Sequence, residues 1–117
     1  MSTKSVIEQY FEAVKAKEEW SRFFSDNVTF TSHVTPVKRV EGRAAFVEST
    51  RRFYSMIAGL EITSLITEGD RACALTRYKL QPPQGSPFST EVAEIFKVVD
   101  EKITSLDIYF DTSPFPK

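Results

Sequence analysis

The chain has 117 residues, and its 15 basic and 16 acidic side chains leave a formal net charge of -1. This length suits one domain that buries about two thirds of its surface, and the balanced charge excludes the basic stripe that nucleic-acid binding requires. A single Cys excludes an intrachain disulfide, and one His with one Cys cannot build the usual zinc sites, so we expect no metal and no cofactor.

No apolar run approaches the roughly 20 residues of a membrane span. Near the amino end, Glu8 and Glu12 interrupt the apolar residues, which is unlike a signal peptide. We therefore expect a cytoplasmic domain that binds neither membranes nor nucleic acid. Ten Phe residues make the chain rich in rings and poor in the usual catalytic side chains.

The first predicted element is an amphipathic helix that runs to about Lys17, because apolar residues recur there at helical spacing. Ser5 and Glu8 form a capping-box pattern at its start. Tyr10 lies on the buried stripe, where a tyrosine hydroxyl usually finds a hydrogen-bond partner. The stripe consists of Val6, Ile7, Tyr10, Phe11 and Val14.

A short helical turn at 20–24 and a strand at 28–32 follow. Pro36 closes this stretch. A second long helix is predicted after Gly42, and Gly59 is the residue expected just past its end. The apolar stripe of this helix consists of Phe46, Thr50, Phe53 and Ile57.

From residue 60 the apolar period changes to that of strands, at 60–67, 72–80, 89–99 and 102–110. Short separators make these four strands antiparallel neighbours. Helices followed by strands predict an α+β fold, in which the helices pack on the concave face of a curved antiparallel sheet. We expect one domain over residues 1–111 and a Pro-containing tail at 112–117.

Strand parity singles out Glu94, because it shares a face with Val92, Phe96 and Val98. Burial among apolar side chains should raise the pKa of its carboxyl group, so that Glu94 can remain protonated and donate a hydrogen bond. The structural alternative is a cross-strand pair with Arg77 or Lys79 that only steadies the sheet. Both interpretations remain open at this stage.

Parity also assigns the last strand, where Leu106, Ile108 and Phe110 should face inward with Thr104. Asp107 and Asp111 should then face outward, although Asp111 sits at the strand end, where the chain can turn. In the first strand, Phe30 and Ser32 share the inner face. His33 should point outward, and Cys73 is expected to be a packed hydrophobic residue.

Five segments carry a family resemblance: 7–11, 24–30, 40–46, 93–96 and 102–111. Together with the order of the predicted elements, they resemble SnoaL-like polyketide cyclases of the nuclear transport factor 2-like superfamily. Ketosteroid isomerases and limonene epoxide hydrolases are relatives within it. The resemblance implies a cone-shaped domain, also called cystatin-like, with a pocket at its open end.

The same resemblance implies candidate catalytic residues. Tyr10 falls where ketosteroid isomerases keep the Tyr of their oxyanion hole, and Glu94 falls where they keep a protonated Asp. Ser32 matches the position of their catalytic base. Asp111 is the nearest match to the Asp that SnoaL-like cyclases use as an acid or base.

We therefore expect an apolar pocket for a small hydrophobic molecule. As an enzyme, the protein would be an isomerase, cyclase or hydratase that polarises a carbonyl or phenol oxygen with Tyr10 and Glu94, with Asp111 or water completing proton transfer. The alternatives are a binding module without chemistry and an assembly domain whose own rings fill the pocket. The predicted pocket residues are Phe30, Ser32, Phe53, Val92, Phe96, Leu106, Ile108 and Phe110.

The outer face of the predicted sheet indicates a homodimer, because its apolar side chains would form an exposed patch on a monomer. The residues of this patch are Ala93, Ile95, Val99, Ile103 and Tyr109.

Overall fold

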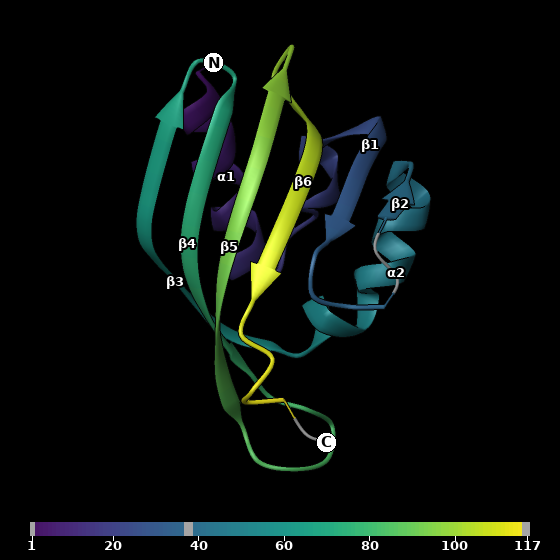
Figure 1. The fold of residues 1–117 in the computed structure, drawn as a ribbon, viewed down its shortest axis with the longest axis vertical. Helices are drawn as coiled ribbons and strands as arrows, with labels where there is room; N and C mark the ends of the chain where they lie inside the picture. Colours follow the sequence, from purple (N-terminus) through teal and green to yellow (C-terminus); the bar gives the residue numbers. More distant parts are fainter. Residues whose placement is uncertain (1, 37–38, 116–117) are drawn as a thin grey trace.

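One curved sheet and two helices make up the fold, in a computed structural model that describes residues 2–36 and 39–115 (Figure 1). The two helices are α1 (Thr3–Lys15) and α2 (Arg43–Ser55), and a short helical turn, η1 (Ser21–Phe23), lies between them in the sequence. The strands are β1 (Phe24–Ser32), β2 (Arg39–Glu41), β3 (Ile57–Glu68), β4 (Arg71–Leu80), β5 (Phe88–Val99) and β6 (Lys102–Phe110). The predicted α+β class is confirmed.

The strands lie in the order β2-β1-β6-β5-β4-β3. The predicted antiparallel meander of four strands is present as β3 to β6. The sheet as a whole is mixed rather than antiparallel, because β1 pairs with β6 in parallel and β2 adds an antiparallel edge. The physical reason is that β6 ends the meander with a free edge, and β1 is the strand that satisfies its hydrogen bonds.

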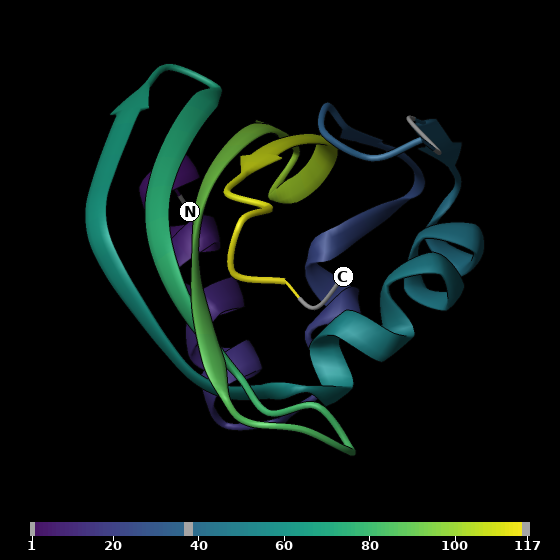
Figure 2. The same cartoon turned by 60° about the horizontal axis from the view of Figure 1, so that its bottom comes forward.

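The sheet wraps around α1, and α2 crosses the open side of the cone beside β1 and β2 (Figure 2). Irregular register in β3, at Ile57/Gly59 and Ile62/Ser64, accompanies this curvature. The predicted stripe of α1 is buried, and its rings meet those of the sheet. Within the described residues, no helix has the length and apolarity that crossing a membrane would require.

Several helix and strand boundaries differ from the predictions, among them the start of β3, where Ile57 lies in the strand rather than on the helix stripe. The α1 helix begins at Thr3, because the Ser2 hydroxyl accepts a hydrogen bond from the Ser5 backbone N–H at 3.1 Å and so caps it. The α2 helix ends at Ser55, and Gly59 lies inside β3, where pairing with Lys79 overrides the helix-end signal. The strand β1 begins already at Phe24.

Ile103 was expected on the outer face but is fully buried. The register of β5 and β6 shifts so that Lys97 pairs with Ser105 while Val98 pairs with Ile103. Thr104 is therefore an extra residue, and its hydroxyl donates to the Lys97 carbonyl at 3.3 Å. This bulge shifts the alternation of inward and outward side chains by one residue on the N-terminal side of Thr104, so the Ile103 side chain points inward.

Phe96 supports the core under α1 and should be more important for stability than for ligand contact. Its ring is fully buried and packs edge-on against Tyr10 and Phe11. We expect Phe96→Ala to lower the free energy of unfolding by about 3–5 kcal/mol in urea denaturation. Phe110→Ala is the control, because this ring is only half-buried. It should lower the free energy of unfolding by about half as much or less. Equal losses of stability in the two variants would contradict the assignment of Phe96 to the core.

Candidate functional site

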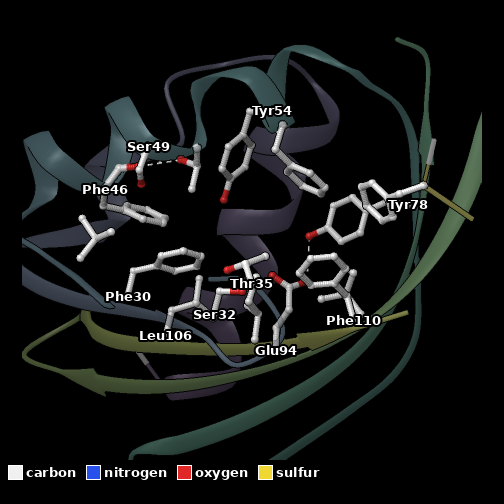
Figure 3. Close-up of a pocket in the computed structure, with 16 residues that line it drawn as sticks. Phe30, Ser32, Thr35, Phe46, Ser49, Tyr54, Tyr78, Glu94, Leu106 and Phe110 are labelled. Carbon is white, nitrogen blue, oxygen red and sulfur yellow. Dashed lines mark hydrogen bonds between the residues drawn. The ribbon is translucent and has the colours of Figure 1, made fainter. Parts of the chain in front are cut away.

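A cavity of about 260 Å³ opens between the concave face of the sheet and α2 (Figure 3). Its wall is almost entirely apolar and aromatic. The residues predicted from sequence that lie on this wall are Phe30, Ser32, Phe53, Val92, Leu106, Ile108, Phe110 and Glu94. The further wall residues are Thr35, Val40, Phe46, Ser49, Thr50, Tyr54, Tyr78 and Phe115.

The register of three strands places the polar groups of the cavity floor. Ser32 on β1 pairs with Ile108 on β6, and Ile108 pairs with Glu94 on β5. Side chains of directly paired residues point to the same face of a sheet. These three side chains therefore form one row across the floor, on the inner face that parity predicts.

Glu94 is held by two hydroxyl groups. Its side chain is buried, and its Oε2 atom accepts hydrogen bonds from Tyr78 Oη at 2.7 Å and Thr76 Oγ1 at 2.8 Å. The predicted alternative partners lie elsewhere: Arg77 is on the convex face, where it pairs with Glu61 and Glu91. The alternating burial of β4 explains the difference, because Thr76 and Tyr78 face inward while Arg77 faces outward.

Burial raises the pKa of Glu94 to about 7, although the hydrogen bonds from Tyr78 and Thr76 oppose the shift. Both protonation states are therefore populated near neutral pH. All hydrogen bonds of Glu94 described in the structure reach Oε2. The Oε1 atom is left to donate or accept a proton toward the cavity.

Tyr10 reaches the cavity only through Tyr54. Tyr10 is fully buried on the inner side of α1, and its hydroxyl lies 2.5 Å from that of Tyr54. Tyr54 lies on the cavity wall, and its ring stacks on Trp20 at 3.8 Å between centroids. Figure 3 shows the Tyr54 hydroxyl pointing into the cavity from the α2 side, opposite Glu94 and Ser32.

Burial raises the pKa of Tyr10, Tyr54 and Tyr78 above the ordinary tyrosine value. All three hydroxyl groups therefore keep their protons near neutral pH. They can act as hydrogen-bond donors in a setting where water is scarce, and such bonds are stronger than in bulk solvent.

Besides Tyr10, two predicted site residues lie off the cavity wall. Phe96 is displaced from it because its ring fills the core beneath α1. Asp111 is exposed beyond the end of β6, where its Oδ1 atom accepts hydrogen bonds from the Ser113 backbone N–H and hydroxyl at 3.0 and 2.8 Å. These bonds lower the pKa of Asp111 and keep it ionised outside the cavity.

The remaining reactive side chains face outward. His33 Nε2 lies 3.1 Å from Asp107 Oδ1, and the His33 ring stacks on Tyr109 on the convex face. Cys73 is a half-buried free cysteine on β4. Across residues 2–36 and 39–115, no three His, Cys, Asp or Glu side chains are placed to hold a metal ion.

Sequence reasoning did not single out Thr76 or Phe115 as residues of the cavity wall or of its polar contacts. Phe115 belongs to the predicted tail, yet its ring packs against Phe88 and Phe110 and completes one side of the cavity. A signal was available for Thr76, because it and Tyr78 lie at the alternate positions of a strand.

The sequence matches the model of a SnoaL-like domain over residues 7–106. Curated protein sequences gave no match. The structure is similar to that of a protein from Bacillus subtilis that is provisionally named an isomerase. The TM-score is 0.82 and the sequence identity is 16%, over 98% of this chain and 96% of that chain.

Two further solved structures share the fold. A protein from Jannaschia sp. CCS1, provisionally named a SnoaL-like polyketide cyclase, gives a TM-score of 0.80 at 13% identity over 98% of this chain and 93% of that chain. A protein from Catenulispora acidiphila with a ketosteroid isomerase-like fold was solved in complex with trimethylamine. Its TM-score is 0.69 at 22% sequence identity, over 81% of this chain and 75% of that chain.

The raised pKa of Glu94 predicts how stability depends on pH. The ordinary pKa of a glutamate side chain is 4.5, and that of Glu94 in the folded chain is about 7. Between these two pH values the folded chain keeps the Glu94 proton, whereas the unfolded chain has released it. The contribution of Glu94 to the free energy of unfolding is therefore fully present below the ordinary value and is lost, by roughly 3 kcal/mol, as the pH rises through about 7.

Glu94→Gln should remove this pH dependence, because glutamine does not titrate. Urea denaturation from about pH 4 to about pH 8 measures it. The control is Glu91→Gln, on the same strand but on the convex face, which should keep the slope of the unchanged protein. Parallel stability curves for Glu94→Gln and the unchanged protein would rule out a raised pKa.

Proposed function

The chain belongs to the SnoaL-like domain family, and we propose that its cavity binds a small apolar ring compound carrying a carbonyl or phenol oxygen. The observation that supports this best is Glu94, the one acidic or basic side chain among the described residues that line the cavity. A largely apolar pocket with few polar groups is the usual design of a small-molecule site. The cavity is also open rather than filled by its own rings, which favours ligand binding over a purely assembly role.

Tyr54 would donate to the ligand oxygen, and Glu94 would contact that oxygen in a bound phenol or the neighbouring carbon during turnover. The Tyr54 hydroxyl enters the cavity from α2, while the Glu94 side chain lies opposite it on the sheet side. Hydrogen bonds from fixed donors in a water-poor site stabilise negative charge that develops on an oxygen atom. In this proposal Tyr10 is a positioning residue, because its hydroxyl fixes that of Tyr54.

An isomerase reaction would need one proton carrier, and Glu94 can be that group. As a carboxylate it would take the proton from a carbon next to the carbonyl, while Tyr54 donates a hydrogen bond to the resulting enolate oxygen. Return of the same proton to a different carbon gives the isomer and restores the carboxylate. A pKa of about 7 suits this role, because an acid–base catalyst works best near the ambient pH.

The alternative is a carrier that binds such compounds without turnover. Ser32 supports this candidate, since a neutral hydroxyl stands where isomerases keep their base. Asp111 does not replace that base, because its side chain lies outside the cavity. The two candidates differ in whether the unchanged protein accelerates a reaction that depends on Glu94.

Glu94→Gln separates turnover from binding. We expect it to slow conjugation of a β,γ-unsaturated cyclic ketone, followed by ultraviolet absorbance, by about 100-fold or more. The affinity for naphthol should change much less, because glutamine retains the shape and one donor. Glu91→Gln serves as the control.

Turnover that survives Glu94→Gln would contradict the catalytic role. Naphthol binding without any turnover by the unchanged protein would favour the carrier. Absence of both would contradict the proposed function.

We also propose that two copies pair through the convex face of the sheet. Ile66, Leu75 and Tyr109 are 61%, 43% and 46% exposed there. Arg77 lies between Glu61 and Glu91 on the same face. This face therefore offers both signs of charge, which suits the self-complementary surface of a two-fold contact.

Light scattering coupled to size-exclusion chromatography tests the pairing. The unchanged chain should elute at twice its monomer mass, and Leu75→Lys should shift it toward the monomer by burying a charge in the contact. Ala45→Lys at an exposed position of α2, away from that face, is the control. A monomer of the unchanged chain at micromolar concentration would defeat the proposal.

A further inference from the structure

Ser32 carries a buried hydroxyl group with no hydrogen-bond partner. The residue is 5% exposed, and its Oγ atom is the one buried side-chain polar atom left unsatisfied among the described residues. Leaving such a group unpaired costs about 1–3 kcal/mol. Because Ser32 lies on the cavity wall, a molecule inside the cavity can supply the missing partner.

The other wall hydroxyls are already engaged. Ser49 and Thr50 both donate to the Phe46 carbonyl, at 3.0 and 2.8 Å. Tyr54 is paired with Tyr10, and Tyr78 donates to Glu94. Thr35 also has an interaction partner within the chain. Ser32 is thus the wall hydroxyl without a partner among the described residues, whereas Tyr54 can accept from Tyr10 and still donate to the ligand as the proposed function requires.

The position of Ser32 relative to Glu94 sets the spacing of the two polar contacts. They occupy one row of the sheet with Ile108 between them, so they are two strands apart. Neighbouring strands lie about 4.8 Å apart, which puts the two backbone positions about 10 Å from each other. Figure 3 shows both side chains on the sheet side of the cavity, beneath Tyr54.

We propose that Ser32 is a specificity-determining residue that binds a second oxygen of the ligand. Resting on the proposed function, this assigns the ligand class as a rigid apolar ring compound with oxygen substituents at both ends. One oxygen meets Glu94 and Tyr54, the ring body covers Ile108, and the other oxygen meets Ser32. A serine hydroxyl both donates and accepts, so the second oxygen can be a carbonyl or a hydroxyl.

Two probes of similar shape test the assignment by isothermal titration calorimetry. One is naphthol, and the other is the naphthalenediol with hydroxyl groups at opposite ends of the two rings. The unchanged protein should bind the diol roughly three- to tenfold more tightly, the effect of one net hydrogen bond. Ser32→Ala should abolish this preference and leave naphthol affinity within about twofold.

Two matched variants control for changes in packing. Ser49→Ala removes a wall hydroxyl that is already engaged, so it should keep the preference for the diol. Ser32→Thr keeps the hydroxyl group and should retain the preference as well.

The outcomes separate the two proposals. Equal binding of both probes, unaffected by Ser32→Ala, would overturn the role of Ser32 while leaving the proposed function in place. If the unchanged protein binds neither probe, the proposed function fails and this inference fails with it.

Discussion

Burial of a carboxyl group is the constraint around which this cavity is organised. An ionisable side chain in an apolar interior is costly unless its environment supplies partners or lets it stay neutral. Glu94 has both, since two hydroxyls from β4 hold one of its oxygens and burial raises its pKa to about 7. The pairing of β4 with β5 thus stabilises the group and leaves its second oxygen available to the cavity.

The division of the aromatic side chains follows from where the two helices pack. Beneath α1 the rings of Tyr10, Phe11 and Phe96 fill the space completely. Beside α2 the rings line a space instead of filling it, because this helix packs chiefly against β1 and β2 at the edge of the sheet. Tyr10 and Tyr54 connect the two regions by a hydrogen bond between their hydroxyl groups, which fixes the Tyr54 hydroxyl against the core.

Strand parity predicted the inward direction of several residues of this site, because side chains alternate regularly along β5 and along β6 from Ser105 to Phe110. It placed Glu94, Leu106, Ile108 and Phe110 on the inner face. Parity failed at Ile103, where one extra residue reverses the alternation and no local sequence signal marks the bulge. It also could not choose the partners of Glu94, since these depend on the register between β4 and β5, and register is set by the whole sheet. The parallel contact of β1 with β6 was missed for the same reason.

That parallel contact has a consequence for how the chain folds. Ser32 and Ile108 are register partners although 76 positions separate them in the sequence, as 108 minus 32. Contacts of such long range are entropically costly and form slowly, whereas the β3 to β6 meander can assemble from neighbouring segments. During synthesis β6 is the last of the six described strands to emerge, so the helices and the other five strands precede both the complete meander and the completed floor. A ligand can therefore meet both ends of the polar row only after the first and last strands have joined.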